Sequence, residues 1–271
     1  MIYIVGWVSV VFAVFHLSMH FLFRTRDNGD SQSVEPVPTV FPTIDGADIA
    51  AVFVGKRMAG DFYDSIRVSP QRILIGLLDV AGRREDNRQI LVAAQKMFRE
   101  SGPELFAAQD VNEADAMTEL SLRINRGLID MAGVLSCPAF IACYHEEFGT
   151  LCYANDGHIP GLLRDATGIS ELTSTGLPLG LFSHATSDSR IVAMEKGAQL
   201  VVVSNGVISC EGNGSGSDGQ FGLDRVKEVL QNAPSEGPQA LCSSILSSAG
   251  KFSGHAPICD DRTALALIRT K

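Results

Sequence analysis

Four short segments place carboxylate or amide side chains next to apolar segments, and together they could bind a metal ion. Asp79 ends the apolar run 73–82 (ILIGLLDVAG), where an unpaired carboxylate would cost several kcal/mol. Carboxylates packed together repel one another unless a divalent cation neutralises them, and hard oxygen ligands favour Mg²⁺ or Mn²⁺. Each acid taken singly is also explained as a turn former. The other three segments are Gly60-Asp61 with Asp64, Ser204-Asn205-Gly206 and Asp260-Asp261.

A pair of such ions could lower the pKa of a bridging water and supply hydroxide to a phosphorus centre. The spacing of the acids leaves this as one hypothesis among several. Each segment precedes or follows a predicted strand, so the fold could bring the strand ends together at one end of the sheets.

The elements that would position these acids form an α+β pattern. Strand-like runs occupy 48–55, 61–68 and 72–80, then 139–146, 149–155, 161–165, 199–208 and 263–270. Apolar residues at helical spacing predict helices over 86–100, 111–130, 223–232 and 239–248. Runs of strands followed by pairs of helices favour antiparallel sheets over a doubly wound parallel sheet.

Composition limits the class of protein. With 271 residues and 45% hydrophobic content, the chain can bury one substantial core, or one core plus an appendage. The net charge of -9 and the lack of a Lys/Arg cluster argue against a nucleic-acid surface. The 6 cysteines show no CxxC spacing, which gives little support for a zinc site and fits a reducing compartment.

Residues 2–23 (IYIVGWVSVVFAVFHLSMHFLF) contain no charged side chain, and the run is as long as the ~20 residues that a membrane helix needs. A signal peptide usually has a basic start, a shorter apolar core and a small-residue cleavage site. None of these is clear here, so we favour an uncleaved single-pass anchor. Arg24 and Arg26 follow directly. Basic residues favour the cytoplasmic side of a membrane helix, so we expect a soluble part in the cytoplasm and an N-terminus on the outer side of the cell (inner) membrane.

His16 and His20 would share one face of that helix because they are four residues apart. Three interpretations stay open. We favour packing of this face against a partner helix. The two histidines could also be polar side chains without a specific partner, or could offer imidazole to a haem or pigment. An absorption spectrum would test the last one.

The sequence therefore predicts three parts. Residues 1–24 form a transmembrane helix, residues 25–43 a linker rich in Pro, Ser and Asp, and residues 44–271 the folded domain. Within the domain, residues 212–219 (GNGSGSDG) predict a surface loop, since no GK[ST] follows to make a phosphate-binding loop.

Seven motifs occur in an order that resembles the bacterial metal-dependent protein phosphatases of the sporulation stage II E type, relatives of the type-2C serine/threonine phosphatases. The resemblance covers roughly residues 44–269. The motifs are GDFYD, LLDVAG, YANDGH, TGLPLG, VVVSNGV, FGLDRV and DDRTALALIR.

The resemblance implies an αββα sandwich with two Mn or Mg ions at one edge of two antiparallel sheets. It implies that Asp79 bridges both ions, that the Val80 carbonyl binds one, and that Asp260 binds the second with Asp261 beside it. Asp61 would hold metal-bound water or a ligand position. The implied reaction is attack of metal-activated water on phosphoserine or phosphothreonine of a cytoplasmic phosphoprotein, without a phosphoenzyme.

Other residues in these motifs have two readings each. Lys56 or Arg57 could contact the phosphate, or could be a solvated basic pair. His158, in NDGH where the family has Asn-Ala-Gly-His, is expected to be a structural hydrogen-bonder rather than a general acid.

Two departures from the family pattern bear on activity. Asn205 stands where the family has a metal-ligand Asp, and a change of this kind commonly weakens metal binding about 10 to 100-fold. Gly82 leads into RREDNRQ, which alters the turn after Asp79. Two hypotheses follow: a membrane-anchored serine/threonine phosphatase, or a catalytically impaired subunit that binds membrane-protein partners through its N-terminal helix. We predict weak manganese-dependent hydrolysis that Asn205→Asp increases.

Overall fold

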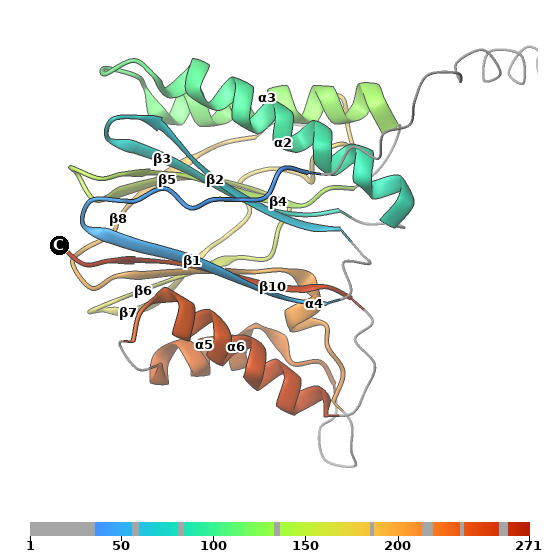
Figure 1. The fold of residues 1–271 in the computed structure, drawn as a ribbon, viewed down its shortest axis with the longest axis vertical. Helices are drawn as coiled ribbons and strands as arrows, with labels where there is room; N and C mark the ends of the chain where they lie inside the picture. Colours follow the sequence, from blue (N-terminus) through green and yellow to red (C-terminus); the bar gives the residue numbers. More distant parts are fainter. Residues whose placement is uncertain are drawn as a thin grey trace, which may run out of the picture. The chain divides into compact units, whose positions relative to one another are not determined.

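The computed structural model describes residues 36–55, 60–80, 84–132, 136–184, 187–212, 219–233, 236–254 and 260–271. Two antiparallel sheets stack on each other, and each has five strands (Figure 1). One sheet has the order β1 (Ala47–Val54), β10 (Arg262–Arg269), β9 (Gln199–Val203), β6 (Gly161–Asp165) and β7 (Gly168–Leu172). The other has the order β2 (Asp61–Ser69), β3 (Arg72–Asp79), β4 (Ala139–His145), β5 (Thr150–Asp156) and β8 (Arg190–Ala193).

Helices cover the outer faces of both sheets. The pair α2 (Arg84–Phe106) and α3 (Glu113–Ala132) packs on the sheet that contains β3, and α5 (Gly222–Asn232) with α6 (Pro238–Ser253) packs on the sheet that contains β10 (Figure 1). A short helix, α4 (Asn205–Ile208), follows β9. The predicted α+β sandwich of two antiparallel sheets between helices is confirmed.

Strand β3 shows why its sequence has no alternation of apolar and polar residues. Ile73, Ile75 and Leu77 point into the core between the two sheets, whereas Leu74 and Leu78 point toward α2 and α3. Both faces of a central strand are buried in a four-layer fold, so both must be apolar. Full burial of each such side chain contributes about 1.5–3 kcal/mol. Asp79 ends this strand where the buried layers end.

Most predicted elements are confirmed, with two corrections. The strand predicted over 199–208 ends at Val203, because the chain turns into α4, where the Val207 and Ser209 amides donate to the Ser204 and Asn205 carbonyls. Strands β7 and β8 were not predicted. Both pair along one side only at the edge of a sheet and are largely exposed, so they lack an apolar pattern.

No helix in the described ranges is long and apolar enough to cross a membrane. Residues 2–23, with His16 and His20, lie outside those ranges, so the transmembrane helix remains a prediction.

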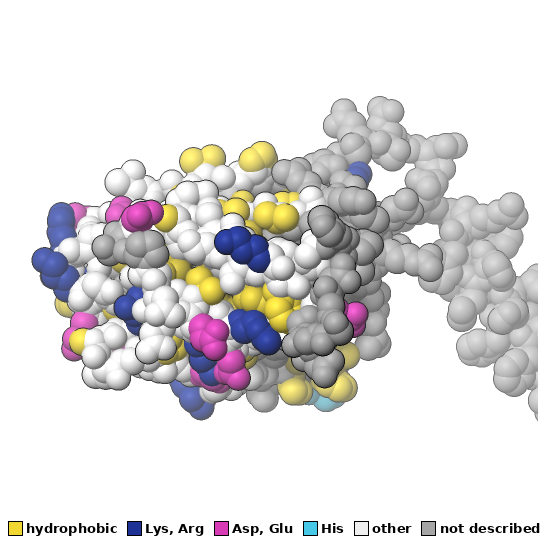
Figure 2. Space-filling view, turned by 90° about the horizontal axis from the view of Figure 1, so that it is seen from below, with side chains coloured by type: hydrophobic (Ala, Val, Ile, Leu, Met, Phe, Trp, Pro, Cys, Tyr) yellow, Lys and Arg dark blue, Asp and Glu magenta, His cyan; other side chains and the backbone are white. Residues whose placement is uncertain are grey.

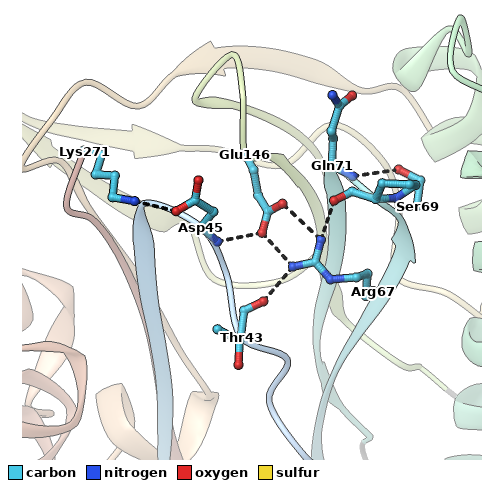
Figure 3. Close-up of polar contacts among 8 residues, drawn as sticks. Thr43, Asp45, Arg67, Ser69, Gln71, Glu146 and Lys271 are labelled. Carbon is cyan, nitrogen blue, oxygen red and sulfur yellow. Dashed lines mark hydrogen bonds and ion pairs between the residues drawn. The ribbon is translucent and has the colours of Figure 1, made fainter.

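A cluster of polar contacts joins the two sheets near the end of β2 (Figure 3). The Arg67 guanidinium donates to both carboxylate oxygens of Glu146, at 2.6 and 3.0 Å, and to the carbonyls of Thr43 and Pro70. Glu146 also accepts the Asp45 amide at 2.8 Å. The chain that enters β1 is thereby fastened to β2 and to the turn after β4.

We expect Arg67→Ala to lower the free energy of unfolding by about 1–3 kcal/mol, since hydrogen bonds to a charged group are lost and a largely buried Glu146 is left behind. The matched control is Lys271→Ala. Its ion pair with Asp45 is 73% and 79% exposed, so it should change stability by less than about 1 kcal/mol. Chemical denaturation measures both. Equal losses of unfolding free energy in the two variants would contradict a stabilising role of Arg67 in this cluster.

The face formed by α5 and α6 carries scattered side chains of both charge signs (Figure 2). A shallow groove between the two helices is lined mainly by polar residues, including Ser243, Ser244, Ser247 and Ser248 of α6 and Lys251. Neither the charge distribution nor the groove concentrates groups that would bind a particular ligand.

Candidate metal centre

The first residue of β2 and the last residue of β3 are register partners, so Asp61 and Asp79 face each other across the two strands. Side chains of such partners have Cβ atoms about 4.5–5.5 Å apart. The Asp79 amide donates to the Pro138 carbonyl at 2.9 Å, which holds the end of β3 to the segment before β4. Two carboxylates predicted from separate motifs are therefore adjacent.

The other acids come from the opposite sheet. Asp260 and Asp261 directly precede β10, and the Thr263 hydroxyl at the start of β10 donates to Asp61 Oδ2 at 2.7 Å. The Asn205 amide at the start of α4 donates to Asp79 Oδ2 at 2.9 Å. These two hydrogen bonds connect the sheets at one edge. The fold thus brings Asp61, Asp79, Asn205, Asp260 and Asp261 to one edge, and their roles as metal ligands stay predictions.

Close backbone packing holds the segment 204–206 against the segment 260–263 at the start of β10. A Cβ on Gly206 would lie 2.0 Å from the Asp261 carbonyl oxygen, so glycine is required after Asn205. The Ser204 amide donates to the Thr263 carbonyl, and the Thr263 amide donates to the Ser204 hydroxyl, both at 3.0 Å. The Ser-Asn-Gly motif is therefore tied to the segment that carries Asp260 and Asp261.

Burial and mutual repulsion raise the pKa values of three carboxyl groups in this site. Burial and the nearby charge of Asp79 raise the pKa of Asp61 to about 8, against hydrogen bonds from Ser204 and Thr263 that lower it. Burial and the charge of Asp261 raise the pKa of Asp79, and burial and the charge of Asp79 raise the pKa of Asp260. A cation placed among these oxygens would relieve both the repulsion and the cost of burial.

The donor set fits a hard divalent cation in chemistry, since all side-chain donors are oxygens. The acids are grouped rather than closed around one point: no three His, Cys, Asp or Glu side chains of the described ranges form a ready ligand set. The Val80 carbonyl accepts a hydrogen bond from Asn87 Nδ2 at 3.0 Å. Because a carbonyl oxygen has two lone pairs, this hydrogen bond leaves one of them for the metal contact predicted for Val80.

Several predicted site residues lie elsewhere or outside the description. Asp64, grouped with Asp61 by sequence, is fully buried and accepts from Arg99 at 2.6 and 3.0 Å and from Gln95 at 3.1 Å. It is bound to α2 rather than available to a metal. Lys56 and Arg57 lie outside the described residues, so their predicted contact with phosphate stays a prediction.

His158 lies in the turn between β5 and β6 and is 4% exposed. Its amide donates to Asn155 Oδ1 at 2.8 Å, and its Nδ1 lies 3.0 Å from the Ile159 carbonyl oxygen. Burial lowers its pKa to about 4. A neutral, enclosed imidazole that bonds its own turn agrees with the structural role we expected.

This burial makes stability depend on pH in a defined direction. The unfolded chain takes up the His158 proton near its ordinary pKa of about 6.5 and the folded protein near about 4. Stability from the neutral ring is therefore present above about 6.5 and is lost as pH falls to about 4, with a total on the order of 3 kcal/mol. Denaturation curves recorded across this pH range give the free energy of unfolding at each pH. This free energy should fall less steeply with falling pH in His158→Gln than in the native protein. An unchanged slope would contradict this account.

Three residues of the site were missed by sequence reasoning. Thr263 was assigned only to a strand, Ser204 was noted only as part of a motif, and Asn87 was assigned to a helix. Ser204 and Thr263 act through hydrogen bonds to segments far away in the chain, whereas Asn87 bonds the Val80 carbonyl just before its own helix. The only local signal was their position beside a predicted acid or amide.

The sandwich is that of the type-2C (PP2C) phosphatases. The SiaA PP2C domain of Pseudomonas aeruginosa superposes with a TM-score of 0.68 at 17% identity, covering 82% of this chain and 86% of that chain. RsbX, solved in complex with magnesium, superposes with a TM-score of 0.58 at 13% identity, covering 84% and 97%. Identities this low show the fold alone.

Residues 69–270 match the family model of stage II sporulation protein E (SpoIIE), so the chain belongs to that family. The phosphoserine phosphatase RsbU of Bacillus subtilis (strain 168) is 27% identical over 176 residues, which are 64% of this chain and 50% of RsbU. The chain thus spans half the length of this relative. Together the family and fold confirm the resemblance that the seven motifs indicated.

Proposed function

We propose that this protein is a metal-dependent phosphatase that hydrolyses phosphoserine or phosphothreonine in a protein substrate. The observation that carries the proposal is the convergence of Asp61, Asp79, Asp260 and Asp261 from both sheets at one edge of the sandwich. Membership of the SpoIIE family and the likeness to a phosphoserine phosphatase support it.

The residues of the chain would hold and orient the reacting groups. The Thr263 hydroxyl donates to one oxygen of Asp61, and the backbone amide of Asn205 donates to one oxygen of Asp79. These hydrogen bonds limit the rotation of both carboxylates. The other carboxylate oxygens remain available as ligands. Asp260 accepts the Asp261 amide at 2.9 Å, which leaves its second oxygen for the same purpose.

One or two divalent ions, Mg²⁺ or Mn²⁺, would bind among these oxygens and would supply an activated water for attack on phosphorus. Magnesium in the related RsbX supports this choice. Asp61, Asp79 and Asp260 are the residues we assign to the ions, with Asp261, Asn205 and the Val80 carbonyl beside them. The pKa of Asp61, raised to about 8, implies that metal binding at this carboxylate releases a proton near neutral pH.

We further propose that the domain is held at the inner membrane by residues 2–23 and acts on a cytoplasmic phosphoprotein. The uncharged run and the arginines that follow it support this placement. A protease-protection assay on sealed vesicles tests the orientation. Protection of the domain in inside-out vesicles would contradict it.

The activity is tested with the full chain in detergent and p-nitrophenyl phosphate as a generic ester. We expect turnover that needs added Mn²⁺ or Mg²⁺, that ends when a chelator is added, and that is slow. Phosphoserine and phosphothreonine peptides should be hydrolysed, and a phosphotyrosine peptide should not be preferred. If neither the native protein nor Asn205→Asp turns over at millimolar manganese, the enzyme interpretation is wrong and the impaired-subunit alternative is favoured.

A further inference from the structure

A pocket of about 230 Å³ opens beside the candidate metal centre. Asp61 and Asp261 belong to both the pocket and the acid group. We call this whole pocket the flanking pocket. Its remaining described walls come from segment 36–39, from the ends of β1 and β2, and from α2. The apolar residues among them include Pro36, Val37, Pro38, Phe53, Phe62 and Leu91.

Segment 36–39, predicted as part of a linker, is fastened at this wall. The amide and carbonyl of Val37 bond the two ends of the Gln95 side-chain amide at 2.7 and 2.8 Å. The Thr39 hydroxyl donates to the Tyr63 carbonyl at 2.7 Å. Gln95 in turn donates to Asp64, the buried carboxylate that Arg99 neutralises. The pocket wall is therefore built from defined hydrogen bonds.

The size of the flanking pocket limits what it can hold. Sites for cofactors and drug-sized ligands usually occupy about 300–1,000 Å³, so about 230 Å³ is small for a nucleotide and large enough for a single side chain. Most walls are apolar. The charged groups that line it are of both signs, Asp61 and Asp261 against Arg88. This mixed lining does not favour a side chain of either charge sign, whereas the apolar walls favour an apolar one.

We propose that the flanking pocket binds an apolar side chain next to the phosphorylated residue of the protein substrate. The inference rests on the proposed function, because a phosphoryl group held at the acids would place its neighbouring residue beside Asp61 and Asp261. The occupant is then a phosphoserine or phosphothreonine segment with a leucine-like residue directly before or after the phosphorylated position.

The test measures binding and turnover separately. Fluorescent phosphoserine peptides that differ only by Leu or Asn at the preceding or the following position are titrated with the full chain in Mn²⁺, and anisotropy gives Kd. At one of the two positions we expect the Leu peptide to bind about tenfold more tightly, in the range that apolar pockets discriminate. Turnover of p-nitrophenyl phosphate, which has no flanking residue, is measured in parallel.

Two matched variants locate the effect. Val37→Trp would fill the pocket from the exposed segment, and Val40→Trp makes the same change three residues later, outside the described walls. These valines are 56% and 80% exposed, so neither change threatens the core. In Val37→Trp we expect the Leu and Asn peptides to bind with about equal Kd. In Val40→Trp we expect the tighter binding of the Leu peptide to be kept. Val40→Trp, outside the pocket, should turn over the generic ester like the native protein.

Equal affinity for Leu and Asn peptides at both positions would overturn the inference, and so would a preference that survives in Val37→Trp. Loss of the preference in Val40→Trp as well would also overturn it. Absence of ester turnover with a retained, Val37-dependent Leu preference would instead contradict the proposed function and leave the peptide-binding pocket supported. The two proposals therefore fail on different measurements.

Discussion

Replacing Asp79 by asparagine is expected to lower kcat/KM for p-nitrophenyl phosphate by at least about 100-fold. Changes that only neighbour a metal ligand commonly cost 10 to 100-fold, and Asp79 is central to the acid group. It faces Asp61 across β2 and β3, and its charge raises the pKa of both Asp61 and Asp260. Steady-state kinetics with manganese in excess measures the effect.

The same substitution should change stability in the opposite direction. Asparagine can still accept the Asn205 amide, while the buried negative charge is removed. The metal-free variant is therefore expected to unfold at a higher temperature than the metal-free native protein. Stabilisation by added Mn²⁺ should shrink.

Asp224→Asn is the matched control, because its side chain on α5 is 93% exposed. It should change neither activity nor the response to manganese. Loss of activity in Asp79→Asn together with lower stability would indicate misfolding and contradict the assignment.

Replacing Asn205 by aspartate is expected to increase manganese affinity about 10 to 100-fold. The Asn205 side chain is exposed at the start of α4, and its backbone amide already bonds Asp79. A new carboxylate would thus reach the acid group without a burial penalty. Turnover at limiting manganese should rise by a similar factor. Calorimetric titration and steady-state kinetics measure the two quantities.

The cost of this gain should be visible without metal. A further negative charge beside Asp79 and Asp260 adds repulsion, so metal-free Asn205→Asp is expected to be less stable than the native protein. Asn232→Asp, at the exposed end of α5, is the control and should leave metal affinity unchanged. Unchanged affinity in Asn205→Asp would contradict its position at the metal centre.

Local patterns were sufficient for much of the fold. Strand β3 was predicted within one residue because a central strand, buried on both faces, must be a continuous apolar run. Helices α2 and α3 were predicted from apolar spacing, although α2 continues to Phe106 through Pro103. The exposed edge strands β7 and β8 left no such pattern.

The candidate site was predictable where a motif carries its acid at the start or the end of a predicted strand, or directly before it. Asp61, Asp79 and Asp260 were found in this way. Asp64 was grouped with them because it lies in the same motif, but a β-strand places residues three apart on opposite faces. Its side chain therefore turns to α2, where Arg99 binds it.

The sequence by itself determined the family, the two-sheet architecture and the acids that could hold a metal, because burial and motif order are properties of short segments. Only the tertiary structure decided how these acids are held. The bonds from Thr263 to Asp61 and from Asn205 to Asp79 span 202 and 126 positions of the chain. Contacts over such separations depend on how the two sheets stack, and no local pattern of residues encodes that register.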